Sequence, residues 1–474
     1  MPRRRAYSTM ADGSVAGEGL PVGMSRPALG SRVPWALSGA AMVLVLLAPA
    51  IWNGYPIIFP DTGGYLIAAM TGTPMLGRSA LYGLFLSAGI PFAFWPCVIV
   101  QCALVAWLFV VTVRVNGLGG RPWLALGIVT VTTVTTSLPW FAGQLMPDIM
   151  FAAAALALYA LTFAHDRLGR GERFALAAVM ALAITTHMAA AVLSVAVIAA
   201  LWLLRFIRQL ALPKPRLTFA ASAVAAGLAL CLMSNVVLIG KFGFTPGGTS
   251  FLFGRLIEDG IVQQYVEDKC PDPALRICAY KDDIPDEADN WLWGEDTAFY
   301  KLGGWDGFAE EQGRIIRETL TLYPMEHLRT AIVATFGQIL AFETEVSIDD
   351  NEPTFQAYAQ LIPDKLPALM QARQQNDQPD VVPLNKYLYV PAATLAMAVV
   401  AVAFIMRRRL NLTPETAALC FTLLLMLLAN AAVCGIFSHP VDRYQSRLVL
   451  LAPFVVAILV AQRVRTPVKG GLAS

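Results

Sequence analysis

The chain has 474 residues, of which 57% are hydrophobic and 14% charged, with a formal net charge of +2. Soluble domains carry about 25% charged residues, so this composition excludes an ordinary soluble protein and predicts an integral membrane protein. The apolar runs are long and lack the two-residue alternation of a β-barrel. The expected fold class is therefore an all-α bundle of about ten transmembrane helices with outward-facing insertions.

Ten apolar segments define the predicted spans. The run from Phe174 to Leu204 is too long for one ordinary span, and we divide it at Thr185-Thr186-His187 into two short helices. The predicted spans cover residues 34–51, 91–113, 122–139, 148–163, 174–185, 187–204, 217–240, 388–406, 414–437 and 447–462.

Lysine and arginine set the predicted orientation. With the N terminus inside, ten spans place the C terminus inside as well, and the inside segments then hold a large excess of basic residues. The segment from Leu328 to Phe342 is also apolar. Counting it as a span would put Arg407-Arg408-Arg409 outside, so we expect an interfacial or re-entrant helix there.

The same topology divides the chain into five parts. A secretory signal ending near Ala48-Pro49-Ala50 is an alternative for the first of them, although the Arg run lies far from the apolar core. The parts are a disordered basic cytoplasmic tail (1–33), an N-terminal bundle (34–240) with a first outer loop (52–90), a periplasmic insertion (241–326), an interfacial helix with a periplasmic loop (327–386), and C-terminal helices with a cytoplasmic tail (387–474).

Two of the seven cysteines lie outside the apolar spans. Cys270 and Cys278 are eight residues apart in the predicted periplasmic insertion, and Pro271 and Pro273 lie between them. In an oxidising compartment such a pair forms a disulfide. Zinc is the alternative, but no histidine lies nearby in the sequence. The pair therefore favours a disulfide, a bacterial inner membrane and a periplasmic insertion.

Two acids follow proline at the outer ends of predicted helices. Asp61 lies in the first outer loop, and Asp148 begins the fourth span. Each could be an ordinary helix N-cap. A charged carboxylate at membrane depth is costly, which favours a paired or working group, and Asp61 is the candidate general base.

A third polar segment lies between the last two spans and contains His439, Arg443, Tyr444 and Arg447. Outward arginines run against the positive-inside bias. They could snorkel to lipid headgroups, or they could bind a phosphate in the bidentate manner that suits Arg. Arg78 is another outward cation, and His187 and His439 are candidate acid-base groups or structural residues.

The sequence lacks the motifs of several function classes, so nothing in it supports an ATP-driven protein, a metal site of Cys and His, or a serine hydrolase. The chain has no Walker-type loop, no Cys/His cluster at metal spacing and no Ser hydrolase elbow. It also has no basic face with interleaved aromatics, so no nucleic-acid partner is expected.

Three motifs, taken together, resemble those of polytopic GT-C glycosyltransferases, in particular the protein mannosyltransferase and aminoarabinose transferase branch. FPDTGGYL followed by GRSALYGLFL is similar to their first outer loop, MPDIMFAAAALALYAL to the entry of their fourth helix, and HPVDRYQSRLVLLAP to a segment before a late helix. The resemblance covers scattered motifs in the first 200 residues and the last 40.

The resemblance implies a polyprenyl-phosphate-linked sugar donor and an inverting transfer on the periplasmic face to an envelope glycan, lipid or protein. Asp61 would be the base or the acid that orients the acceptor, Asp148 a second acid, and Arg443 a contact to the donor phosphate. Tyr65, Arg78, His439 and Tyr444 are further candidate substrate contacts. A divalent metal is a candidate cofactor, but the first loop has one acid where many members have two adjacent ones, which puts metal dependence in doubt.

Two other functions compete with this one. A transporter or flippase of a lipid-linked substrate would place ionisable residues near the midplane and often shows paired repeats, whereas these acids lie at span ends and no repeat is visible. A non-catalytic envelope assembly protein would use the insertion to bind a partner. The placement of the acids favours the enzyme.

Overall fold

The computed structural model describes residues 29–204, 206–207, 212–244, 247–346, 351–376 and 378–465. Most of the predicted N-terminal tail and the end of the C-terminal tail lie outside these residues. Across the described ranges the chain is helical, as the sequence predicts, and β pairing is limited to one bridge between Ile57 and Gln144.

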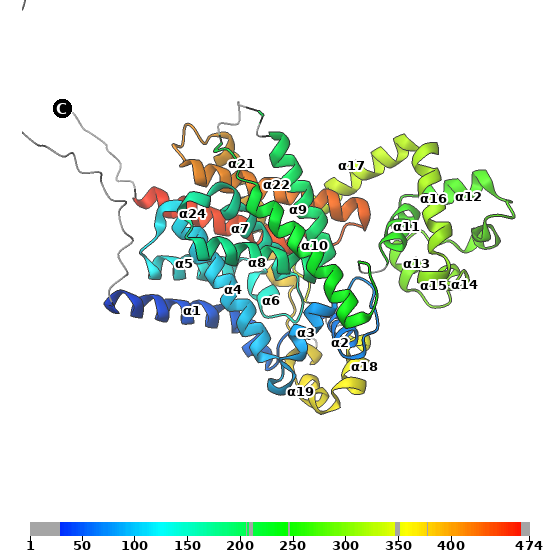
Figure 1. The fold of residues 1–474 in the computed structure, drawn as a ribbon, viewed down its shortest axis with the longest axis horizontal. Helices are drawn as coiled ribbons and strands as arrows, with labels where there is room; N and C mark the ends of the chain where they lie inside the picture. The colour runs from blue at the N-terminus through cyan, green and yellow to red at the C-terminus, as the bar shows by residue number, and fades with distance from the viewer. Residues whose placement is uncertain are drawn as a thin grey trace, which may run out of the picture.

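The larger part of the molecule is a bundle, and a smaller helical module projects from one end of it (Figure 1). We call this end the site end, because the residues discussed below gather there. The bundle consists of α1 (Leu29–Asn53), α4 (Trp95–Val113), α5 (Pro122–Thr135), α7 (Ile149–Phe163), α8 (Arg170–Thr186), α9 (Met188–Leu204), α10 (Thr218–Ile239), α21 (Val390–Ile405), α22 (Pro414–Phe437) and α24 (Leu451–Arg465).

Six helical segments of the described chain are long and apolar enough to cross a membrane, which gives it the character of a multi-pass membrane protein. They are 33–53, 95–118, 218–239, 382–405, 414–437 and 442–464. Each coincides with a predicted span. Three more predicted spans correspond to shorter apolar helices, α5, α7 and α9. The count of ten spans therefore stays a prediction.

Helix α7 is the centre of the bundle. All of its residues are buried, and α4, α8 and α22 pack around it. A helix that is apolar on every side, rich in alanine and flanked by neighbours on every side is the expected core of a bundle. Its first turn begins directly after Asp148, so the fold places that acid at the end of the most buried helix.

The division of the run 174–204 is also as predicted. Helix α8 ends at Thr186 and α9 begins at Met188, with His187 in an extended conformation between them. The break brings the ends of both helices, and His187 with them, to the site end.

Short helices cover the site end of the bundle. Helices α2 and α3 come from the first predicted outer loop (52–90). Helix α18 comes from the predicted periplasmic loop within 327–386, and α23 leads directly into α24. Their bounds are α2 (Thr62–Thr71), α3 (Ala80–Ser87), α6 (Leu138–Ala142), α18 (Glu352–Leu361), α19 (Leu366–Met370), α20 (Val382–Leu384) and α23 (Asp442–Val449).

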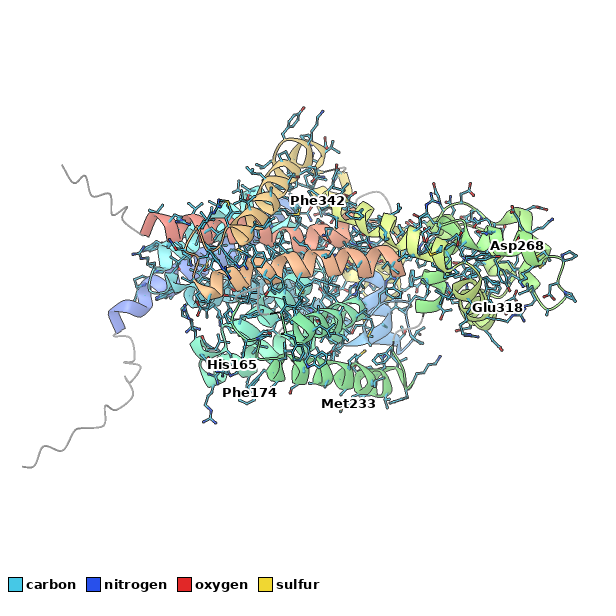
Figure 2. All side chains as sticks on the ribbon, turned by 90° about the horizontal axis from the view of Figure 1, so that it is seen from above. His165, Phe174, Met233, Asp268, Glu318 and Phe342 are labelled. Atoms are coloured by element: carbon cyan, nitrogen blue, oxygen red, sulfur yellow. A yellow bond between two sulfur atoms is a disulfide. The ribbon has the colours of Figure 1, made fainter. Side chains whose placement is uncertain are left out.

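The module has its own hydrophobic core, which includes Phe253, Tyr265, Trp291 and Phe308. In the view of Figure 2, Asp268 and Glu318 mark the module, beyond the end of the bundle. Its helices are α11 (Gly248–Glu258), α12 (Ile261–Lys269), α13 (Ala288–Trp293), α14 (Ala298–Lys301), α15 (Gly304–Gly307) and α16 (Ala309–Leu322). The structure joins Cys270 and Cys278 in a disulfide within this module.

Helix α17 (Pro324–Leu340) connects the module back to the bundle and packs against α22 and α23. Its other face leaves apolar side chains exposed, among them Val333, Phe336 and Leu340. Helix α17 contacts one end of α22, where Gly435 lies against Ala334. Its interfacial or re-entrant placement in the membrane stays a prediction.

Candidate active site

The loop before Asp61 is held rigidly from two sides. Ile57 pairs with the chain before α7, where its N–H donates to Gly143 and its carbonyl accepts from Leu145. The amide side chain of Gln374 then bonds both the N–H and the carbonyl of Ile58, at 3.0 and 2.8 Å. Three segments far apart in sequence therefore fix the position of the loop.

The two glycines after Asp61 have separate structural reasons. A Cβ at Gly63 would lie 2.7 Å from the Cα of Thr354, so only glycine allows α18 to approach α2 this closely. The Gly63 N–H donates a 2.9 Å hydrogen bond to the Thr354 hydroxyl across this contact. A Cβ at Gly64 would meet the stem of Arg78 at 3.3 Å. The Thr-Gly-Gly sequence thus makes room for α18 and for Arg78.

Asp61 binds two arginines. Its Oδ1 accepts a hydrogen bond from Arg78 in a part-buried ion pair. Its Oδ2 lies 3.6 Å from Nη1 of Arg443, which comes from α23 at the other end of the chain. The structure therefore brings together the acid and both arginines that the sequence singled out, and Oδ2 is the oxygen beyond hydrogen-bond distance of its cation.

Neither acid caps its helix through its side chain. Asp61 and Asp148 stand at the N-cap positions of α2 and α7, but both have helical backbone angles and no side-chain capping bond. Capping is the interpretation that competes with a functional role, and the contacts of these two side chains do not support it.

Asp148 lies deeper than Asp61, with 1% of its side chain exposed. Its Oδ1 accepts a 2.8 Å bond from Nη1 of Arg447, which is as completely buried. The Arg447 guanidinium stacks 3.4 Å over the ring of Phe151, and the ring of His187 meets the same phenylalanine at 4.9 Å. Asp148 is therefore the partner of a buried cation.

Two donor nitrogens of Arg443 make no hydrogen bond to the part of the chain that the structure describes, although one of them is ion-paired with Asp61. Its side chain is 11% exposed, and among the described residues its Nε and Nη1 make no hydrogen bond. The guanidinium lies 4.3 Å over the ring of Phe59 and 5.6 Å from the ring of Tyr444. Guanidinium donors in this position can bind an anionic acceptor such as a phosphate oxygen.

Glu345 is a further acid at this site. It lies in the segment after α17, where Glu343 donates its N–H to Asp442 of α23 at 2.7 Å. Burial raises the pKa of Glu345, and the positive charge of Arg443 opposes that rise. A carboxyl group near a cation cluster with a raised pKa is a candidate acid-base group.

The remaining predicted contacts lie around this cluster. Tyr65 is buried, with its ring edge-on to Tyr82 at 5.0 Å, so its side chain is a packing element of α2. Tyr444 lies between the two guanidinium groups of α23. His439 is further out, where its Nε2 is 3.6 Å from a carboxylate oxygen of Asp289 in the module.

The sequence analysis counted Arg447 among the outward arginines without predicting its partner, and it missed Glu345. Arg447 lies four positions after Arg443, and that spacing places two arginines on one face of a helix, so the sequence carried the signal. Glu345 carried none, because only the return of the chain after α17 brings it to Arg443.

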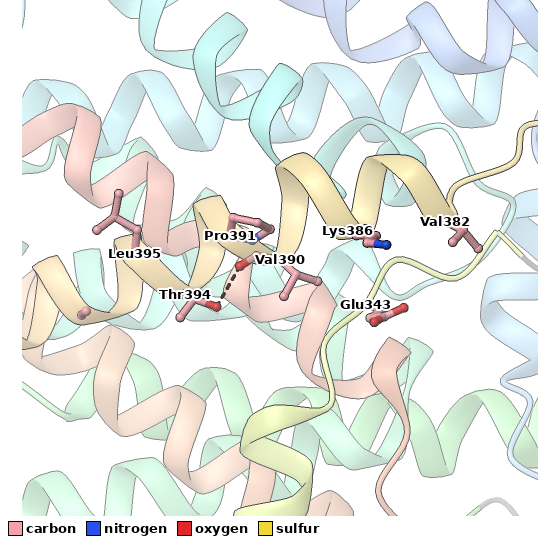
Figure 3. Close-up of a pocket in the computed structure, with 8 residues that line it drawn as sticks. Glu343, Val382, Lys386, Val390, Pro391, Thr394 and Leu395 are labelled. Carbon is pink, nitrogen blue, oxygen red and sulfur yellow. Dashed lines mark hydrogen bonds between the residues drawn. The ribbon is translucent and has the colours of Figure 1, made fainter.

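An apolar groove of about 730 Å³ runs along α21. Glu343 and Lys386 lie at one end of it, and side chains of α21 continue it away from the site end (Figure 3). Because Glu343 bonds Asp442, the neighbour of Arg443, the charged end of the groove lies next to the arginine cluster. Its lining residues are Glu343, Val382, Lys386, Val390, Pro391, Thr394, Leu395 and Ala398.

No group of three or more His, Cys, Asp and Glu side chains that could hold a metal ion occurs in the described parts of the chain. Asp61 and Asp148 instead face arginines. No family model, curated protein or solved structure matches the chain.

Proposed function

We propose that this protein is a membrane glycosyltransferase of the GT-C type, which moves a sugar from a polyprenyl phosphate to an envelope acceptor. The observation that carries the proposal is the meeting of Asp61, Arg78 and Arg443 from two ends of the chain, where Nε and Nη1 of Arg443 make no hydrogen bond to the described residues. A carboxylate beside cations supplies both groups that the transfer of a sugar from a phosphate requires.

The proposed step is a direct displacement. The acceptor hydroxyl oxygen bonds to the anomeric carbon of the donor sugar while the bond from that carbon to the phosphate oxygen breaks. The phosphate leaves with the electron pair and is stabilised by Arg443. The hydroxyl proton passes to Asp61, whose Oδ2 makes only the long contact to Arg443. The sugar inverts at the reacting carbon.

The groove along α21 supports a lipid donor. Its wall is mostly apolar side chains of a helix long enough to cross a membrane, and a lysine lies at its charged end. A polyprenyl chain in the groove would leave its phosphate at the arginine cluster. In this proposal the bilayer is the bacterial inner membrane, the site end faces the periplasm and both termini are cytoplasmic.

The proposal is tested by replacing Asp61 with Asn in the chromosomal gene and profiling the envelope glycans. We expect loss of one glycan or glycan modification, because removing a general base slows such reactions by about 10²- to 10⁴-fold. Protein level and thermal unfolding of the purified variant are measured in parallel, so that loss of the protein is not mistaken for loss of the reaction.

Asp364→Asn is the matched control. Asp364 is also at the site end, is mostly exposed and, within the described ranges, forms its one ion pair with its neighbour Lys365. An unchanged glycan profile in a well-expressed Asp61→Asn strain would overturn the enzyme proposal and favour transport or assembly.

A further inference from the structure

The module carries a cluster of three aromatic rings at the edge of its core, which we call the aromatic platform and define as Phe251, Trp293 and Trp305; Trp293 is exposed and the other two are half-buried. The rings of Trp293 and Trp305 are 5.3 Å apart, and Phe251 lies 6.2 Å from the first and 5.6 Å from the second. Trp293 is 48% exposed, whereas the tryptophan of the module core, Trp291, is fully buried. An exposed tryptophan at the edge of an aromatic cluster is typical of a surface that binds a ligand or a partner.

The sequence around the two platform tryptophans is rich in carboxylates. Residues 281–310, which contain both tryptophans, hold nine Asp and Glu against two Lys. Four of these acids are exposed close to the tryptophans in sequence, namely Asp289, Glu295, Asp296 and Asp306. This composition repels phosphate headgroups and anionic glycans. It suits a ligand with apolar faces and many hydroxyl or amine donors, since carboxylates accept hydrogen bonds.

Two contacts hold the platform next to the candidate active site. The first is at Gly247, which lies between Leu76 of the first outer loop and two rings of the platform. A Cβ added to Gly247 would be 3.1 Å from Leu76, 3.2 Å from Phe251 and 3.5 Å from Trp305. The carbonyl of Leu76 accepts a 2.6 Å hydrogen bond from Arg78, the partner of Asp61. One side of the platform is therefore linked to Asp61 through two residues.

The second contact comes from the other arginine. Asp289 begins the turn of α13 that ends with Trp293, and it pairs with His439 at 3.6 Å. His439 lies four residues before Arg443, on the segment that leads into α23. The module therefore contacts both the loop that carries Arg78 and the segment that leads to Arg443.

We propose that the platform binds sugar rings of the acceptor, and that these sugars are uncharged or carry amines. The C–H face of a sugar stacks on Trp293 and Trp305, and carboxylates of the same segment accept bonds from its hydroxyl or amine groups. This inference rests on the proposed function, since it makes the acceptor a glycan or a glycan-bearing molecule. The sugar ring that binds is not the one that reacts.

A membrane surface is the rival occupant, because tryptophans also gather at membrane interfaces. The excess of acids argues against it, since anionic lipids would be repelled from residues 281–310. The experiment below therefore measures sugar binding and membrane contact separately.

The test uses the full-length protein in phosphatidylcholine nanodiscs. Tetramers of N-acetylglucosamine, glucosamine and mannose are titrated by calorimetry against the wild type, Trp293→Ala and Trp305→Ala. We expect at least one tetramer to bind, and each substitution to weaken it about five- to tenfold, the effect of losing one aromatic contact. Trp123→Ala is the matched control, because Trp123 is 57% exposed on α5 of the bundle.

Absence of binding by all three tetramers, or equal binding by the Trp293→Ala variant, would overturn the inference. The membrane arm attaches a nitroxide to a Trp293→Cys variant, in which the five free native cysteines are buried. We expect a water-soluble nickel complex to relax this nitroxide, because the inference places residue 293 in water. If oxygen, which concentrates in lipid, relaxes the nitroxide more strongly than the nickel complex does, the platform lies in the membrane and the inference is overturned.

The outcome is separable from that of the proposed function. Asp61→Asn should bind the same tetramer with unchanged affinity, because Asp61 is not part of the platform. If the platform binds sugar while Asp61→Asn leaves the glycan profile unchanged, the sugar site stands and the transfer reaction fails. If the glycan is lost in Asp61→Asn but no tetramer binds, the reaction stands and the acceptor site fails.

Discussion

At the scale of single residues, the site is two acid-arginine contacts at different depths. The outer one, Asp61 with Arg78 and Arg443, is part-buried and includes Arg443 donors that make no hydrogen bond to the described residues. The inner one, Asp148 with Arg447, is completely buried and makes a short, well-formed bond. Ligand binding would be easiest at the outer contact, whereas breaking the inner one exposes an uncompensated charge to the core.

We predict that Arg447→Met strongly destabilises the protein. Removing one partner of a buried ion pair costs about 3–5 kcal/mol because the other charge stays buried. The Asp148→Asn, Arg447→Met double variant should recover a large part of that loss. Unfolding of the purified variants in one detergent measures both, and strictly additive losses would show that the two side chains do not act as a pair.

The raised pKa of Glu345 gives a second prediction at this scale. A carboxylate can act as a base only while it is deprotonated, at a pH above its pKa. If Glu345 takes part in the reaction, activity should therefore be lost on lowering the pH already above the ordinary Glu range, because the pKa of Glu345 is raised. Glu345→Gln should remove that fall from the pH profile. A transfer rate with the same acid limb in wild type and variant would exclude Glu345 from the reaction.

At the scale of elements, close packing of short helices sets the position of the arginines. Helices α2 and α3 touch so closely that a Cβ at Gly83 would lie 1.9 Å from the carbonyl oxygen of Tyr65. Arg78 comes from the turn before α3, and Asp61 directly precedes α2. The distance between these two side chains therefore depends on the contact at Gly83.

We predict that Gly83→Ala separates α2 from α3 and weakens function as well as stability. Overpacking of this kind costs about 1–3 kcal/mol, and the resulting shift of α3 moves Arg78 relative to Asp61. Gly39→Ala on α1 is the control, because nothing lies within 4 Å of its added Cβ. Equal thermal stability of the two variants would contradict this account of the helix contact.

At the scale of the whole molecule, the fold separates a bundle from a module with a core of its own. The module is joined to the bundle at Gly247 and through α17, and the ion pair of His439 with Asp289 closes the contact. Every predicted site residue that comes from the bundle lies at the end of the bundle that carries the module. The site end of the bundle holds the acids and the arginines, and the module that projects from it carries the aromatic platform.

The proposed orientation is tested with topology reporters. Alkaline phosphatase inserted after Asp283, on the exposed surface of the module, should be active, because it reaches the periplasm. The same enzyme fused after Ser474 should be inactive, whereas a green fluorescent protein at that position should fluoresce. The opposite pattern would reverse the orientation and would place the candidate site in the cytoplasm.

The sequence by itself was enough to predict the helical class, the positions of the apolar helices and the break at His187, because hydrophobicity and helix-breaking residues act locally. It also singled out Asp61, Arg78 and Arg443, since charges at helix ends are conspicuous in an apolar chain. Their joint position could not be predicted in this way, because residues 61 and 443 are separated by nearly the whole chain.

Only the tertiary structure decided which charges meet. It paired Asp148 with Arg447, brought Glu345 to Arg443 through the return of α17, and turned Tyr65 into a packing residue. It also placed Trp293 and Trp305 beside the loop of Arg78. Each of these depends on how helices distant in sequence pack against one another, and the pattern of hydrophobicity along the chain does not encode that choice.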